Sequence, residues 1–142
     1  MFFDDFTVGR RFSIPPVTIA KEMMLSFAEI YDPLPFHLDE DFAEKSRFKG
    51  LIAPGVMSFM SVWAEFVRTG ILRDGLIAGK STKIEWFAPV YAGDVLTGHA
   101  VVSEAYREKM TSGNVTIVLD IHNQHGVMVI RDTTEVVVRA RS

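Results

Sequence analysis

The sequence of 142 residues contains no cysteine, which excludes disulfide bonds and thiolate-ligated metal sites. A chain without cysteine suits a reducing compartment, and we expect a cytoplasmic protein. There is also no block of basic residues, and the formal net charge of −3 argues against nucleic acid as the main partner. The first five residues, MFFDD, lack the basic start of a secretory signal.

Long hydrophobic runs are missing as well. The longest apolar stretch, residues 51–67, is interrupted by Pro54, Gly55, two serines and Glu65. It falls short of the roughly 20 residues that a membrane-spanning helix needs, so we expect a buried helix and no membrane partner. Hydrophobic residues still make up 48% of the chain, and mean hydropathy is +0.17. We therefore expect a single domain over residues 1–142, with some apolar surface covered by a second subunit.

Helical periodicity dominates the first half of the chain. Apolar residues at helical spacing predict a helix over residues 21–31: Met24, Phe27, Ala28 and Tyr31. Pro33 must end that helix. A short helix is expected over residues 39–45, with Asp39 as its N-cap. A longer helix is expected over residues 53–68, and its nearly continuous apolar surface indicates that it is enclosed on most sides.

Alternation of apolar and polar residues dominates the second half. Strands are predicted near residues 10–17, 80–87, 95–102, 116–123 and 127–138. Pro15 and Pro16 restrict the first of these to a sheet edge, because proline cannot donate a ladder hydrogen bond. Helices followed by a run of antiparallel strands indicate an α+β fold. We expect a curled antiparallel sheet wrapped around the long central helix.

Residues 32–39 (DPLPFHLD) place an acid and an imidazole at fixed positions, Asp32 and His37. Pro33 and Pro35 fix their own φ angles and push the residues before them toward extended geometry. The pattern therefore predicts a rigid, non-helical loop. Proteins carry constrained loops of this kind mostly where chemistry is done, so the two side chains are candidates for a catalytic pair.

The same segment resembles the hydratase signature Asp-x-Asn-Pro-x-His-x-Asp of MaoC-like dehydratases, the family of (R)-specific enoyl-CoA hydratases with the hot-dog fold. Residues 51–57 (LIAPGVM) resemble the family's entry into its central helix. Residues 87–94 (FAPVYAGD) resemble its F-x-x-P-V-x-x-G-D turn. The three segments occur in the family's order and at its spacing, so the resemblance covers nearly the whole chain.

The resemblance implies reversible hydration of a 2-enoyl thioester carried on coenzyme A or acyl carrier protein, with no cofactor and no metal. Asp32 and His37 would activate water and transfer the α-proton. The backbone N–H of Gly55 would stabilise the enolate oxygen, because amides in a first helical turn are unpaired. Further substrate contacts are expected from five residues: Ala53, Pro54, Leu34, Phe36 and Trp63. We expect a homodimer, with assembly beyond the dimer left open, because the sheet has edges and an apolar face that a second copy would cover. In the family the pantetheine arm lies between subunits.

Three positions depart from the family pattern. Leu34 replaces its asparagine, Pro54 replaces the histidine of its His-Gly pair, and Trp63 falls near a family serine and would narrow the pocket. A non-catalytic acyl-thioester-binding or partner subunit therefore stays open as an alternative. A hot-dog thioesterase is disfavoured, because such enzymes usually place their acid on the central helix and Glu65 lies late in it.

Two histidine clusters have the residue types of metal sites. In the first, His37, Asp39 and Asp41 alternate along the chain, but the two acids suit the start of the short helix better. In the second, His122 and His125 flank a predicted turn without a third ligand nearby. Neither predicts a metal site.

Two groups of basic residues compete for a role in attracting the phosphates of coenzyme A. Lys45, Arg47 and Lys49 precede the central helix, whereas Lys80 and Lys83 belong to a predicted strand. The simpler interpretation of either group is a solvated surface. The sequence does not show which of the two groups would meet the phosphates.

Overall fold

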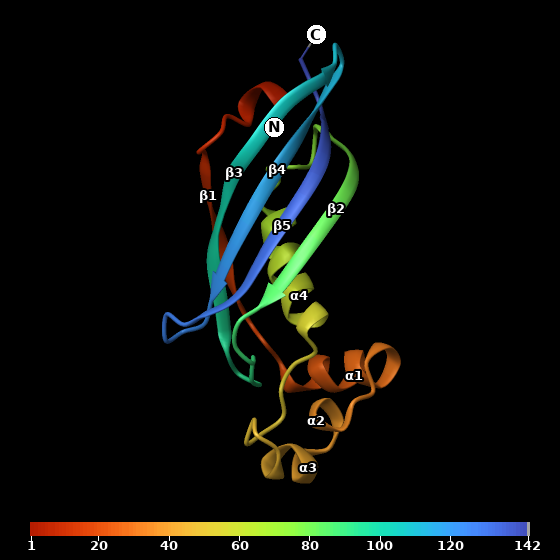
Figure 1. Ribbon diagram of the computed structural model, residues 1–142, viewed down its shortest axis with the longest axis vertical. Helices are drawn as coiled ribbons and strands as arrows, with labels where there is room; N and C mark the ends of the chain where they lie inside the picture. Colours follow the sequence, from red (N-terminus) through yellow and green to blue (C-terminus); the bar gives the residue numbers. More distant parts are fainter. Residues whose placement is uncertain (142) are drawn as a thin grey trace.

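The computed structural model describes residues 1–141, so Ser142, the last residue of the predicted domain, lies outside it. One antiparallel sheet of five strands forms most of the molecule, in the order β1-β3-β4-β5-β2 (Figure 1). The strands are β1 (Arg11–Thr18), β2 (Leu76–Trp86), β3 (Val95–Lys109), β4 (Ser112–His122) and β5 (Met128–Arg139).

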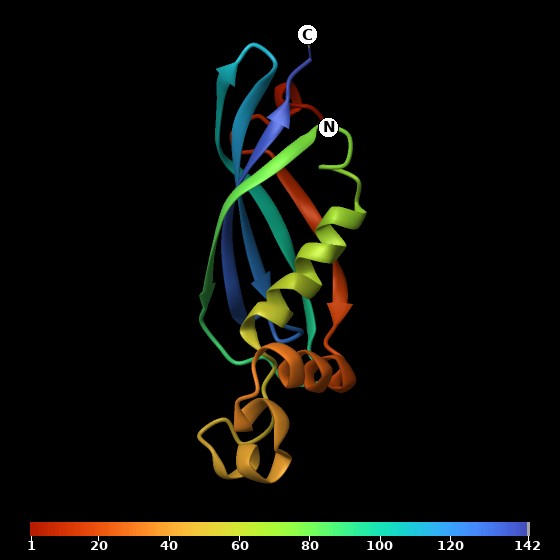
Figure 2. The ribbon, with the colours of Figure 1, turned by 90° about the vertical axis from the view of Figure 1, so that its right-hand side faces the viewer.

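Helix α4 lies along the concave side of the curled sheet, while α1, α2 and α3 gather at one end of the molecule (Figure 2). The helices are α1 (Lys21–Tyr31), α2 (Pro35–Leu38), α3 (Glu40–Lys45) and α4 (Gly55–Arg68), with a 3₁₀ turn η1 (Phe3–Asp5) near the start. Among residues 1–141 there is no helix with the length and apolar character that crossing a bilayer would require.

The core lies between α4 and the sheet. Along β4 every second side chain is fully buried, as the period of two requires of a strand with one covered face: Val115, Ile117, Leu119 and Ile121. From α4, Phe59, Val62 and Phe66 are buried in the same hydrophobic cluster. Each such side chain contributes about 1.5–3 kcal/mol when it leaves water, so this packing fixes α4 on the sheet. The α+β prediction is confirmed.

One carboxyl lies on the buried face of the sheet. Asp132 of β5 is fully buried, and the hydroxyls of Thr82 and Thr134 donate hydrogen bonds to its two oxygens. Burial raises the pKa of Asp132 above its ordinary value, although the two hydroxyls act in the opposite direction. The folded chain therefore holds a proton on this carboxyl more tightly than a solvated aspartate would.

Two expectations about proline are confirmed, the end of the first helix before Pro33 and the edge position of the first strand. Helix α1 ends at Tyr31, before Pro33, and β1 is an edge strand whose register shifts between Ile14 and Val17, where the two prolines lie. Proline in an edge strand removes no hydrogen-bond donor from the interior of the sheet. The predicted N-cap is also confirmed, since the Asp39 side chain accepts a hydrogen bond from the Phe42 amide at 3.1 Å.

Two expectations were wrong. Residues 32–39 are not wholly non-helical, because Pro35–Leu38 forms the single turn α2. Pro35 is tolerated there since the first residues of a helix need no amide donor. Helix α4 is also less enclosed than predicted: three of its apolar side chains are more than 40% exposed within this chain, namely Val56, Met60 and Val67.

Candidate active site

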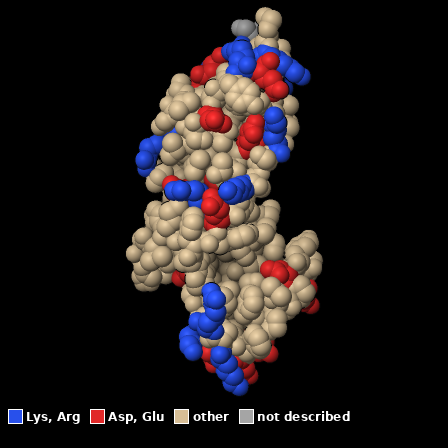
Figure 3. All heavy atoms as spheres, viewed as in Figure 1, with Lys and Arg blue, Asp and Glu red and all other residues tan. Residues whose placement is uncertain are grey.

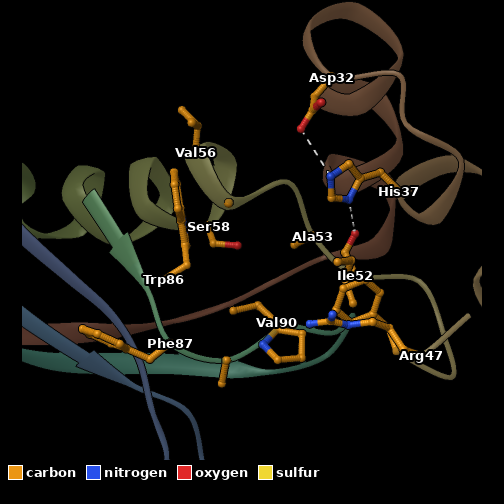
Figure 4. A pocket seen from close by; sticks show the side chains of 14 residues that line it. Asp32, His37, Arg47, Ile52, Ala53, Val56, Ser58, Trp86, Phe87 and Val90 are labelled. Atoms are coloured by element: carbon orange, nitrogen blue, oxygen red, sulfur yellow. Dashed lines mark hydrogen bonds and ion pairs between the residues drawn. The ribbon is translucent and has the colours of Figure 1, made fainter. Parts of the chain in front are cut away.

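His37 makes a polar contact on each side of its ring (Figure 4). The side chain is buried, its Nδ1 atom lies 2.7 Å from the carbonyl oxygen of Ile52, and its Nε2 atom lies 3.2 Å from Oδ2 of Asp32. A carbonyl can only accept, so the hydrogen of the imidazole is on Nδ1. Nε2 is thereby left facing the carboxylate.

The pair of Asp32 and His37 brings an imidazole nitrogen and a carboxylate together at the pocket. A neutral imidazole with its hydrogen on Nδ1 presents a lone pair at Nε2, and an ionised carboxylate opposite it also presents lone pairs. A proton between Nε2 and Oδ2 turns this repulsion into a charge-assisted hydrogen bond. Because the Asp32 side chain is 39% exposed, the pair can exchange that proton with a molecule bound beside it.

Local structure sets the spacing of this pair. Asp32 is the C-cap of α1, where its amide donates to the Ala28 carbonyl at 3.0 Å. Leu34 is the N-cap of α2, and its carbonyl accepts from the His37 amide at 3.0 Å. The Ile52 amide donates to the Phe36 carbonyl at 3.2 Å. Helix α2 is therefore fastened to residue 52 through both the backbone and the imidazole.

Gly55 opens α4 three residues after Ile52, and Pro54 is the N-cap. The amides of a first helical turn have no partner within the helix and carry the positive end of the helix dipole. Glycine lets the Trp86 indole pack directly against this position, because a Cβ here would lie 2.4 Å from Cε2 of the ring. The approach to Gly55 is fixed further by the Ala53 amide, which donates to the Val90 carbonyl at 2.7 Å.

These groups surround one pocket of about 440 Å³ (Figure 4), a volume within the usual range for small-molecule sites. Three lining residues are ionisable: Asp32, His37 and Arg47. The others are apolar or small: Phe48, Ile52, Ala53, Gly55, Val56, Ser58, Trp86, Phe87, Ala88, Pro89 and Val90. An apolar pocket with a few convergent polar groups is the typical form of a binding site.

Four of the predicted site residues line this pocket: Asp32, His37, Ala53 and Gly55. The other four are near it or away from it. Leu34 is 43% exposed at the start of α2, and the Pro54 carbonyl accepts from the Ser58 amide at 3.0 Å. Phe36 packs edge-on against the His37 ring, with centroids 4.6 Å apart.

Trp63 lies two turns along α4 from Gly55. Its ring packs between those of Phe59 and Phe66, with centroids 6.0 and 5.7 Å away, and it is not among the residues that line the pocket. Glu65 is also outside the pocket and forms an ion pair with Arg68 at 2.7 Å.

Sequence reasoning missed the wall formed by Trp86 and Phe87, whose side chains are 50% and 54% exposed. Two adjacent aromatic residues just before the Pro89 turn were the available signal. Ser58 was missed too: it is buried, and Figure 4 shows its hydroxyl pointing into the pocket. Its position one turn after Gly55 was the only hint.

The two groups of basic residues are separated by the structure. Arg47 lines the pocket, whereas Lys80 and Lys83 lie on the edge strand β2 and do not. Lys80 lies 3.5 Å from a carboxylate oxygen of Glu135. Within residues 1–141, no cluster of three or more histidine, aspartate or glutamate side chains is arranged to hold a metal ion.

Comparison with protein families and curated proteins gives a consistent result. The family model described as MaoC like domain matches residues 5–124. The uncharacterized protein YdeM of Bacillus subtilis (strain 168) is 29% identical over 140 residues, which covers 98% of this chain and 99% of the relative.

Solved structures agree in fold. A MaoC-like dehydratase from Rhodospirillum rubrum is 34% identical and superposes with a TM-score of 0.90, covering 100% of this chain and 99% of the other. An (R)-hydratase from Pseudomonas aeruginosa superposes with a TM-score of 0.79 at 23% identity, covering 99% of this chain and 86% of the other. These likenesses confirm the expected hot-dog fold, a curled sheet around a central helix.

Proposed function

The chain belongs to the family of MaoC-like domains, and we propose that it is a hydro-lyase that adds water to, or removes it from, acyl thioesters. The substrate pair is a 2-enoyl and a 3-hydroxyacyl thioester, carried on coenzyme A or acyl carrier protein. One observation carries this proposal: the Nδ1–H of His37 is committed to the Ile52 carbonyl, which turns Nε2 toward Asp32 at the wall of the pocket. Activation of water requires a base whose lone pair points in a defined direction.

Hydration proceeds in two proton transfers. The Asp32–His37 pair takes a proton from water as its oxygen attacks C3 of the enoyl thioester. The electrons of the double bond move onto the thioester oxygen, where the Gly55 amide stabilises the negative charge. The proton held by the pair then passes to C2 as the thioester carbonyl re-forms. The net change is addition of H and OH across C2 and C3, and dehydration is the reverse.

The proposal requires neither a cofactor nor a metal, because an acid–base pair and one amide donor suffice for this reaction. The apolar walls formed by Val56, Trp86, Phe87 and Val90 suit an acyl chain or the pantetheine arm. The MaoC-like dehydratase from Rhodospirillum rubrum supports the reaction class by its 34% identity. The proposal does not specify the length of the acyl chain, because the apolar wall residues restrict the polarity of the bound group more than its length.

We further propose that the protein acts as a homodimer in the cytoplasm. Val56, Met60 and Val67 form an exposed apolar row on α4, and Met23 of α1 is 58% exposed beside the same helix. Met23 and Met60 line one shallow apolar groove together. A second copy of this chain would remove such a surface from water, and C2 dimers are the commonest way to do so.

A turnover assay tests the reaction directly. Purified protein is mixed with crotonyl-CoA, and the absorbance of the conjugated thioester is followed together with release of free thiol. Loss of conjugation without thiol release supports the hydro-lyase. Thiol release identifies a thioesterase instead. Calorimetric binding of acyl-CoA with neither change, over a panel of chain lengths and branching patterns, identifies the non-catalytic binding subunit that Leu34 and Pro54 left open.

A further inference from the structure

Arg47 is the only permanently cationic side chain among the described residues that line the pocket. Within residues 1–141 no carboxylate oxygen lies within 4.0 Å of its guanidinium, and the side chain is exposed. Two exposed lysines, Lys45 and Lys49, flank it in the chain. Figure 3 shows lysine and arginine side chains gathered at the lower end of the molecule, where the segment between α3 and α4 lies.

The guanidinium is held in place although it is exposed. It lies over the Phe48 ring, 5.1 Å from the ring centroid, in the arrangement of a cation–π contact. The Phe48 ring packs against Phe36 at 5.6 Å, and Phe36 packs against His37 at 4.6 Å. A continuous row of rings therefore connects the catalytic imidazole to the cation.

The backbone beneath Arg47 is anchored as well. The Tyr91 hydroxyl donates to the Phe48 carbonyl at 2.7 Å, and the Phe48 amide donates to the Ser46 hydroxyl oxygen at 3.1 Å. A fixed backbone and a stacked guanidinium leave the planar donor edge of Arg47 free to meet a ligand. Arginine presents that edge in the geometry that matches phosphate and carboxylate oxygens in pairs.

We propose that Arg47 binds an oxyanion carried by the thioester substrate, and so determines which thioesters the pocket accepts. The inference rests on the proposed function and extends it to substrate recognition. The rest of the lining offers an oxyanion no other fixed positive charge, and Asp32 at the same pocket would repel one. Substrates of this class carry such groups in two places: phosphates on the carrier arm, or a carboxylate at the far end of the acyl chain.

The experiment varies the residue and the substrate together. Arg47→Ala, Arg47→Lys and the wild type are assayed with crotonyl-CoA, with crotonyl-pantetheine, which has no phosphate, and with glutaconyl-CoA, which adds a carboxylate to the acyl chain. Lys109→Ala is the matched control, because Lys109 is an exposed cation at the end of β3, and that strand ends at the far end of the molecule from α3 (Figure 1).

If the carrier phosphates are the ligand, Arg47→Ala raises KM for crotonyl-CoA by about 10-fold to 100-fold with little change in kcat. The same variant leaves crotonyl-pantetheine unaffected, and Arg47→Lys recovers part of the loss. If the acyl carboxylate is the ligand, the loss is confined to glutaconyl-CoA. An equal loss on all three substrates, or none on any, overturns the inference.

Binding measurements separate this inference from the proposed function. Calorimetry compares free coenzyme A with pantetheine, and the monoamide of glutarate with butyramide, which lacks the carboxylate, on the wild type and on Arg47→Ala. If no substrate is turned over, the hydro-lyase proposal is wrong, yet selective weakening of the charged ligand of either pair in Arg47→Ala still supports oxyanion binding. Identical affinities of the two proteins for all four ligands overturn it.

Discussion

The Nδ1 atom of His37 and the carbonyl oxygen of Ile52 are hydrogen-bonded at 2.7 Å, and this contact sets the chemistry of the pocket. It decides which imidazole nitrogen carries the hydrogen and turns the other toward Asp32. Ile52 also lies three residues before Gly55, so the same short segment positions the proposed oxyanion donor. A displacement of residues 52–55 would disturb base and donor together.

Replacement of Asp32 or His37 tests their assignment as the acid–base pair. In His37→Ala the base is removed, and in Asp32→Asn a group of the same shape cannot exchange the proton. We expect kcat for enoyl-CoA hydration to fall by about 10²-fold to 10⁴-fold in each variant, the usual range for a general acid–base group. Thermal unfolding measured alongside establishes that both variants are folded.

Asp39→Asn is the matched control for that pair. Asp39 lies in the same segment, but its side chain caps α3 through the Phe42 amide, and asparagine can accept that hydrogen bond equally well. We expect wild-type kcat. Full activity in His37→Ala or Asp32→Asn, or a loss in Asp39→Asn as large as theirs, would contradict the assignment.

A methyl group at Gly55 is expected to move the Trp86 indole. The added Cβ would lie 2.4 Å from Cε2 of the ring, and Trp86 is half exposed, so the indole yields before the helix does. Misplacement of this pocket wall is expected to lower kcat/KM by about 100-fold. Tryptophan fluorescence reports the movement in a Trp63→Phe background, because the chain contains two tryptophans.

The double variant Gly55→Ala, Trp86→Ala tests whether the displaced ring causes that loss. It removes the ring that the methyl group displaces, so no displaced indole obstructs the pocket. Recovery of kcat relative to Gly55→Ala alone is expected. If fluorescence and kcat/KM of Gly55→Ala both match the wild type, the close packing of these residues has no role in the reaction.

Burial of Asp132 predicts that its ionisation weakens the fold. Because the pKa of Asp132 is raised in the folded protein, the folded chain holds this proton at pH values where the unfolded chain has released it. The stabilisation is complete below the ordinary value of 3.8 and is lost as pH rises through the raised pKa. Asp132→Asn stays neutral, so its advantage in urea midpoint over the wild type should grow across that window.

Asp120→Asn provides the comparison for Asp132. Asp120 lies on the neighbouring strand β4, its carboxylate is partly exposed, and it pairs with Arg131 at 2.7 Å. We expect no pH-dependent gain in urea midpoint for this variant. A midpoint difference between Asp132→Asn and the wild type that is constant from pH 4 to pH 8 would show that Asp132 does not titrate in this way.

Charge on the exposed row of α4 tests the proposed dimer. Met60 is 53% exposed within one chain, and Met60→Glu would place a carboxylate in the apolar contact between copies. Light scattering after gel filtration should show the mass of one chain for this variant and twice that mass for the wild type. Met110→Glu, at the 87% exposed tip between β3 and β4, should leave the mass unchanged. A monomeric wild type removes the dimer from the proposal.

Local sequence pattern predicted the elements well where one residue type dictates the backbone. Pro33 ended α1, Asp39 capped α3, and Gly55 opened α4, because each depends on its own φ angle or side chain and a few neighbours. Strand β3 continues to Lys109, beyond its predicted end at Val102. The prediction stopped early because residues 103–109 are largely exposed on both faces and show no period of two.

The candidate site was also predicted only in part, because local sequence pattern shows some of its residues and not others. Asp32 and His37 follow from spacing and from the resemblance to a known signature. The Ile52 carbonyl that orients the imidazole carries no side-chain signal at all, since every residue has a carbonyl. Trp86 comes to the pocket from a strand about thirty residues beyond Gly55, a separation that no local pattern spans.

The sequence by itself therefore determined the α+β class, the family resemblance and the acid–imidazole pair, because periodicity, proline and short motifs are local properties. Tertiary structure alone decided that the Nδ1 of His37 faces Ile52 and that Arg47 rather than Lys80 borders the pocket. Both depend on how α2 and the entry to α4 pack against the end of the sheet. Contacts between distant segments arise from the packing of whole elements, which the order of residues along the chain does not display.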